Sequence, residues 1–213
     1  MARYKNGING PLSGKVGNVV AASWRGIHYL KSAADKIGKP ASPAQRNTRL
    51  RFRLVTGWLQ PLRDVIWVGY QVFSESKTPM NGCVSYHLKE AVKGEAPDYE
   101  IDFPKAIFSR GDLLVSLVTG FAALEYGMVK ISWENGPDSI FSRQTDLATF
   151  VVYNVHKQVF VRFGNAAMRG DKQVSLKLPV KHTGDLLHFW MHYVNEQGMG
   201  VSTSVYLGER VLV

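Results

Sequence analysis

The sequence predicts a mainly β protein with an α-helical N-terminal region and a C-terminal β-sandwich of the immunoglobulin or fibronectin type. Three observations support this prediction. The first 53 residues are basic and rich in glycine, the next stretch places apolar side chains at helical spacing, and beyond residue 97 turn residues separate short segments rich in β-branched and aromatic side chains. We therefore divide the chain into a basic arm of short strands (1–41), an amphipathic helical region (42–96) and a β-sandwich domain (97–213).

The positive charge of the chain is concentrated in its first quarter. Residues 1–53 hold eleven Lys and Arg and one acid, Asp35, a balance of +10, whereas the fifteen basic and sixteen acidic residues that follow nearly cancel. A clustered positive field attracts polyanions, anionic membrane surfaces or an acidic patch on a neighbouring subunit. Charge alone does not choose between these partners.

Apolar and aromatic residues are interleaved with the charges of the arm, which is not typical of a solvated, disordered tail. Glycines separate short apolar runs, and we expect tight turns at Asn9-Gly10-Pro11 and Trp24-Arg25-Gly26. This pattern predicts two brief strands that become ordered against another surface.

A helix is predicted to begin near Ser42. Ser42 can cap it, Pro43 suits its first position, and Gln45 completes a capping box. The apolar residues that follow lie three and four apart, at Leu50, Leu54, Trp58, Leu59, Leu62, Val65, Ile66, Tyr70 and Phe73. Pro61 is expected to kink this helix or to split it in two.

A second helix is expected from Cys83 to Val92, after a turn at Asn81-Gly82 and before Gly94. Short strands are expected beyond it, several of them with clean alternation of apolar and polar residues. They are predicted at 99–103, 113–118, 128–133, 148–153, 159–163, 173–178, 186–193 and 200–206.

Several segments resemble a known family. They are Asn6-Gly7-Ile8-Asn9-Gly10, the run Ser13-Gly14-Lys15-Val16-Gly17-Asn18-Val19-Val20, then Trp24-Arg25-Gly26 with Tyr29, and the closing Ser202-Thr203-Ser204-Val205-Tyr206-Leu207-Gly208. The chain is similar along its length to a Bacteroidota family of about 210 residues that is known only as a domain of unknown function. The resemblance implies a shared architecture and a bacterial or phage source. It brings no activity, cofactor or catalytic residue.

Three chemical motifs are incomplete. The stretch from Gly10 to Val16 has three residues between its glycines and a Val after the Lys, so it lacks both the cradle and the magnesium ligand of a phosphate-binding loop. His188 and His192 share one face of a predicted strand, but no third metal ligand accompanies them there. The lone Cys83 is more typical of a small buried residue than of a nucleophile. We predict no cofactor, no metal site and no enzyme.

The candidate contacts to a polyanion or to a neighbouring subunit all lie in the basic first quarter of the chain. They are Lys15, Trp24, Arg25, Tyr29, Lys31, Arg46, Arg49 and Arg53. The last three fall three and four residues apart on one face of the first helix and form a cationic stripe there.

Two functions fit these contacts. The preferred hypothesis is a non-enzymatic structural or assembly protein, virion-related or otherwise phage-encoded, that forms a homo-oligomer when its arm contacts another copy. The alternative is a nucleic-acid-binding protein, in which the cations of the arm and of the stripe contact phosphates while Trp24 and Tyr29 stack on bases. A plainer interpretation is that Lys and Arg only keep an intramolecular hairpin soluble.

Two further expectations concern the rest of the chain. Exposed Trp133 or Trp190 would make the sandwich a carbohydrate- or ligand-binding module. No apolar run reaches the roughly 18 residues that cross a bilayer, and the run from Val19 to Ala22 is shorter than the core of a signal peptide, about 7–15 residues. We expect no transmembrane segment, and a place in the cytoplasm or within a phage-like assembly.

Overall fold

The structure is a computed structural model that describes residues 2–3, 10, 12–24, 26–34, 40–73 and 77–213. The chain divides into two compact units, residues 1–42 and residues 43–213. We call them the N-terminal unit and the body.

The N-terminal unit contains one antiparallel sheet. Its strands are β1 (Ala2–Arg3), β2 (Gly14–Val16), β3 (Val19–Trp24) and β4 (Ile27–Ser32), in the order β1-β4-β3-β2. Gly17 and Gly26, at the turns that join β2 to β3 and β3 to β4, have φ of 56° and 77°, which glycine adopts without a steric penalty. The arm therefore forms more strands than the two expected. Arg25 in the second predicted turn, and Asn9 and Pro11 in the first, lie outside the described residues.

The helices of the body follow the predicted apolar spacing. They are α1 (Pro43–Leu59), α2 (Arg63–Gly69) and α3 (Pro79–Glu90). Pro61 lies in a 3-10 turn, η1 (Gln60–Leu62), so the predicted split at this proline is confirmed. Further 3-10 turns are η2 (Gln71–Phe73), η3 (Phe103–Lys105), η4 (Glu125–Gly127), η5 (Arg169–Asp171) and η6 (Val180–His182).

The predicted turn at Asn81-Gly82 is wrong, because both residues lie inside α3. Thr78 is the cap of this helix: its Oγ1 accepts a hydrogen bond of 3.2 Å from the backbone N–H of Asn81, and Pro79 takes the first helical position. The helix ends at Glu90, so Val92 belongs to the strand that follows.

Two antiparallel sheets and a hairpin make up the rest of the body. The larger sheet has the order β10-β9-β12-β13, with β9 at Leu147–Asn154, β10 at Val159–Met168, β12 at Leu186–Val194 and β13 at Val205–Val211. The smaller sheet has the order β11-β8-β7, with β7 at Leu117–Leu124, β8 at Met128–Glu134 and β11 at Gln173–Lys177. The hairpin pairs β5 (Val92–Glu95) with β6 (Asp98–Ile101).

Two predicted strands are displaced. Only the last two residues of 113–118 belong to β7, because the carbonyl of Leu114 accepts a hydrogen bond of 2.7 Å from the buried guanidinium of Arg169. Likewise, most of 200–206 precedes β13, since Ser202 and Ser204 lie buried in a connection where their hydroxyl groups accept bonds from other segments. In both segments, side-chain hydrogen bonds and isolated backbone bridges take the place of a continuous strand ladder.

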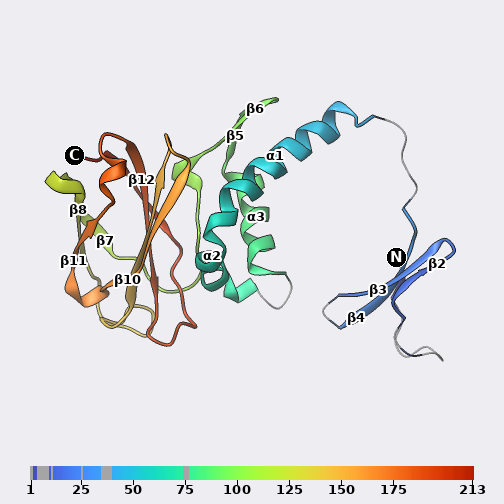
Figure 1. Cartoon of the computed structure of the whole chain (residues 1–213). Helices are drawn as coiled ribbons and strands as arrows, with labels where there is room; N and C mark the ends of the chain where they lie inside the picture. The colour runs from blue at the N-terminus through green and yellow to red at the C-terminus, as the bar shows by residue number, and fades with distance from the viewer. Residues whose placement is uncertain (1, 4–9, 11, 25, 35–39, 74–76) are drawn as a thin grey trace. The chain divides into compact units, whose positions relative to one another are not determined.

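The body has three layers: the smaller sheet, the larger sheet and the helices (Figure 1). One core lies between the sheets and includes Trp133, Phe150 and Phe189, while the other lies between the larger sheet and the helices and includes Trp58 and Trp190. Alternate residues of one strand enter different cores, as the period of a strand requires. The prediction of a mainly β chain with a helical N-terminal region is confirmed, and the two packed sheets are consistent with a sandwich.

Candidate interface on the N-terminal sheet

The strand register assigns each side chain of the N-terminal sheet to one of two faces, because residues directly opposite one another project to the same side. Lys15 and Lys31 both lie opposite Val20. Tyr29 lies opposite Ala22 on one side and Arg3 on the other, and Trp24 lies opposite Ile27. We call this the cationic face; it consists of Arg3, Lys15, Val20, Ala22, Trp24, Ile27, Tyr29 and Lys31.

The other face carries no Lys, Arg, Asp or Glu among the described residues. Val19 lies opposite Val16 on β2 and Ser32 on β4, and Ala21 lies opposite Gly14 and Leu30. Ser23 and His28 complete the face. We call it the neutral face; it consists of Gly14, Val16, Val19, Ala21, Ser23, His28, Leu30 and Ser32.

The sheet has no core of its own. Within residues 1–42, none of the residues whose burial the structure describes is buried. Val16 and Val19 on the neutral face are 82% and 46% exposed, and Trp24 on the cationic face is 48% exposed. Packing of apolar side chains against another layer stabilises most sheets, so this one presents two surfaces suited to a further partner.

Four of the predicted contacts lie together on the cationic face: Lys15, Trp24, Tyr29 and Lys31. Arg25 lies outside the described residues. Arg3 was not among the predicted contacts, and only its pairing with Tyr29 across β1 and β4 places it with them.

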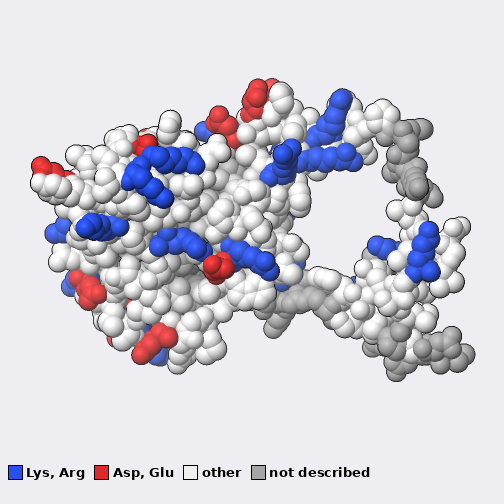
Figure 2. Space-filling model, viewed as in Figure 1, with Lys and Arg blue, Asp and Glu red and all other residues white. Residues whose placement is uncertain are grey.

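The other three predicted contacts belong to the body. Arg46, Arg49 and Arg53 are exposed on α1, where Lys and Arg side chains gather in Figure 2. Among the described residues these three guanidinium groups form no ion pair. They form a second cationic surface, the α1 stripe, on a separate unit from the cationic face.

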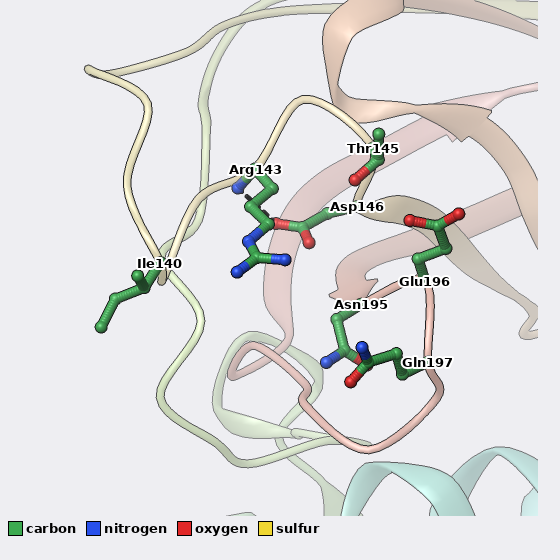
Figure 3. A pocket seen from close by; sticks show the side chains of 7 residues that line it. All are labelled: Ile140, Arg143, Thr145, Asp146, Asn195, Glu196 and Gln197. Atoms are coloured by element: carbon green, nitrogen blue, oxygen red, sulfur yellow. Dashed lines mark hydrogen bonds between the residues drawn. The ribbon is translucent and has the colours of Figure 1, made fainter.

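A small polar hollow of about 150 Å³ lies on the body and is lined by Ile140, Arg143, Thr145, Asp146, Asn195, Glu196 and Gln197 (Figure 3). The Asp146 carboxylate accepts a hydrogen bond of 3.0 Å from the backbone N–H of Arg143 and forms an ion pair of 3.0 Å with Arg169. The Asn195 side chain accepts bonds from the N–H groups of Met199 and Gly200. These polar groups hold the loops of the body together.

Three buried groups of the body, His87, His192 and Cys83, are neutral near pH 7. Burial lowers the pKa of His87 and of His192 from 6.5 to about 4, and it raises the pKa of the Cys83 thiol to about 12. The prediction that Cys83 is a small buried residue is confirmed. Within the described part of the chain, no three His, Cys, Asp or Glu side chains come together in an arrangement that could hold a metal ion.

The expectation of an exposed ligand-binding tryptophan on the sandwich is wrong. Trp133 and Trp190 are 1% and 0% exposed, because each enters one of the two cores. The Trp133 indole N–H donates a hydrogen bond of 2.9 Å to the carbonyl of Arg169, so the polar group of this side chain also stabilises the fold.

No helix in the described residues is long and apolar enough to span a membrane.

Comparison with known proteins gives one family match. Residues 11–208 match the model of a family described as a family of unknown function, DUF6266. No curated protein matches the chain. The match confirms the resemblance to a family of unknown function that the sequence motifs indicated.

Proposed function

The chain belongs to the DUF6266 family, whose function is unknown, and we propose from the geometry of the N-terminal unit that it is a non-enzymatic assembly protein. Copies of the chain associate through the neutral face of the N-terminal sheet and form a homo-oligomer. The observation that carries this proposal is the exposure of an apolar surface that its own unit leaves uncovered, with Val16 at 82%.

Charge favours the neutral face as the contact between copies. Two cationic faces brought together would place Arg3, Lys15 and Lys31 of one copy against the same residues of the next, and like charges repel. Two neutral faces brought together would not repel each other in this way, because their described residues include no Lys, Arg, Asp or Glu. Two sheets can pack face to face at about 10 Å, so that Val16, Val19 and Leu30 of each copy would leave water together.

The size of the neutral face predicts weak contacts between single pairs of chains. Its described apolar side chains are Val16, Val19, Ala21 and Leu30, well short of the roughly 20–30 residues a side of a standard stable interface. We therefore expect association at micromolar concentrations, strengthened where several arms engage at once. That the assembly belongs to a phage or forms in the cytoplasm stays a prediction.

Multi-angle light scattering of the full chain and of a chain that begins at Pro43 tests this proposal. The second chain keeps the body, which holds both cores. The full chain is expected to exceed its monomer mass of 23.8 kDa at low and at high salt, because apolar contacts survive screening, and the shorter chain is expected to remain a monomer. A full chain that stays monomeric at high micromolar concentration would rule the proposal out.

A further inference from the structure

We infer that the cationic face of the N-terminal sheet binds single-stranded nucleic acid. The inference is independent of the proposed assembly, because it concerns the opposite face of the sheet. It starts from the register: three cations and two aromatic rings, distributed over four strands, project to one side.

The cations are spaced so that they can contact more than one phosphate. Lys15 and Lys31 lie on either side of Val20, two strand spacings or about 10 Å apart at the backbone. Arg3 lies on β1, beyond β4 from the other strands. Lys15 and Lys31 are exposed, as is Arg3, and none of the three forms an ion pair among the described residues. Their charges are available to a polyanion.

The rings lie beside the cations. Tyr29 is two residues beyond Ile27, the direct partner of Trp24, so the two rings are diagonal neighbours with about 7–8 Å between them at the strand level. Trp24 is 48% exposed and Tyr29 is partly exposed. Aromatic side chains on a positively charged sheet are the means by which proteins bind single strands without sequence preference, since every base has a face that can stack.

This arrangement favours a single strand over a duplex and over a membrane. The bases of a duplex are already stacked on one another, so Trp24 and Tyr29 would contribute nothing there, and only the phosphate contacts would remain. An anionic membrane surface would use the charges, but it would also need a group of exposed aliphatic and aromatic side chains to insert among the lipids. The most exposed valines of this sheet, Val16 and Val19, lie on the opposite face, and the cationic face has only Ile27 and the partly exposed Val20 as aliphatic side chains larger than alanine.

Fluorescence anisotropy of the full chain with a labelled oligothymidylate of about 16 nucleotides tests the inference. Trp24→Ala is expected to weaken binding by about tenfold, as the loss of one stacked base predicts, and Trp24→Phe is expected to retain most of it. The logarithm of the affinity falls linearly with the logarithm of the salt concentration, and each phosphate contact on a single strand contributes about −0.7 to the slope. Lys15→Gln and Lys31→Gln are each expected to make this slope shallower by about 0.7. Matched controls on the body are Trp67→Ala, where the ring is 60% exposed, and Lys130→Gln, both expected to leave binding unchanged.

The outcomes separate the possible ligands. Tighter binding to oligothymidylate than to a duplex of the same length, lost in the sheet variants and kept in the controls, supports the inference. Four results overturn it: no binding to the oligonucleotide, equal binding to the duplex, equal losses in the control variants, or binding only to vesicles that contain an anionic lipid. Loss of binding in Trp24→Phe equal to that in Trp24→Ala would likewise overturn the role of stacking.

Discussion

The guanidinium of Arg169 lies 3.0 Å from the carboxylate of Asp146, and both side chains are 2% exposed. The same guanidinium donates to Ser116 and to the carbonyl of Leu114, and it lies 3.7 Å from the centre of the Tyr193 ring. It therefore ties the segment before β7 to the end of β10 and to β12.

Removing one member of this pair is expected to destabilise the body. Asp146→Asn leaves a buried guanidinium without its counter-charge, at a cost of about 3–5 kcal/mol in the free energy of unfolding. Urea denaturation measures it. The control is Glu100→Gln, which breaks the exposed pair between Glu100 and Lys93 and is expected to change stability by less than about 1 kcal/mol. Equal effects of the two substitutions would show that the buried pair has no special role.

Two helical glycines are expected to respond to alanine in opposite directions. A Cβ at Gly57 in α1 would meet no atom within 4 Å, so Gly57→Ala should stabilise the chain by about 0.5–1 kcal/mol. A Cβ at Gly69 in α2 would lie 2.3 Å from the carbonyl oxygen of Phe108, so Gly69→Ala should destabilise it by about 1–3 kcal/mol. Thermal unfolding distinguishes the two, and a shift of the same sign in both would contradict the packing of α2 against the segment at Phe108.

Stability is expected to fall as the pH drops from about 6.5 to about 4. His87 and His192, with pKa lowered by burial from 6.5 to about 4, stay neutral in the folded chain across this window. Their unfolded forms take up protons there, so protonation favours the unfolded state, and the contribution of both residues to stability is fully present only above pH 6.5. Burial lowers the pKa of His182 and His188 as well, which adds to the same trend.

Urea titrations between pH 4 and pH 8 measure this dependence. His192→Leu removes one of the titrating groups and should make the dependence of unfolding free energy on pH shallower, by the equivalent of close to one bound proton. A stability that does not change with pH in this window would contradict the burial of these imidazoles.

The elements predicted best from the sequence are those with a strong local period. The apolar spacing that runs from Leu50 to Tyr70 gave α1 and α2. Strict alternation gave β8, and a run of mostly aliphatic and aromatic residues gave β12, each within one residue. Predicted strand boundaries were wrong where a long-range contact determines them. The carbonyl of Leu114 accepts a hydrogen bond from Arg169, which is 55 residues away in the sequence. The pair Asn81-Gly82 is typical of a turn, but both residues lie in α3 because the helix begins earlier, at the cap formed by Thr78.

Four residues of the cationic face, Lys15, Trp24, Tyr29 and Lys31, were named from the sequence as candidate contacts, but their arrangement could not be predicted. The sequence shows that cations and apolar residues alternate in the arm, yet a shift of one residue in strand pairing would exchange the two faces. The turn at Gly17 and Asn18 sets the pairing of Lys15 with Val20 and of Val16 with Val19, and so separates the cationic face from the neutral face. The proposed contact between copies and the proposed nucleic-acid contact therefore concern opposite faces of one sheet.

The most direct test of the assembly proposal is the mass of the full chain by light scattering, as a function of concentration, for the natural sequence and for two single-lysine variants. Val16→Lys puts a charge on the neutral face, and Asn18→Lys puts the same charge in the adjoining turn. We predict that the mass rises above 23.8 kDa for the natural chain and for Asn18→Lys, and that Val16→Lys stays a monomer. Assembly of Val16→Lys equal to that of the natural chain would contradict the role of the neutral face.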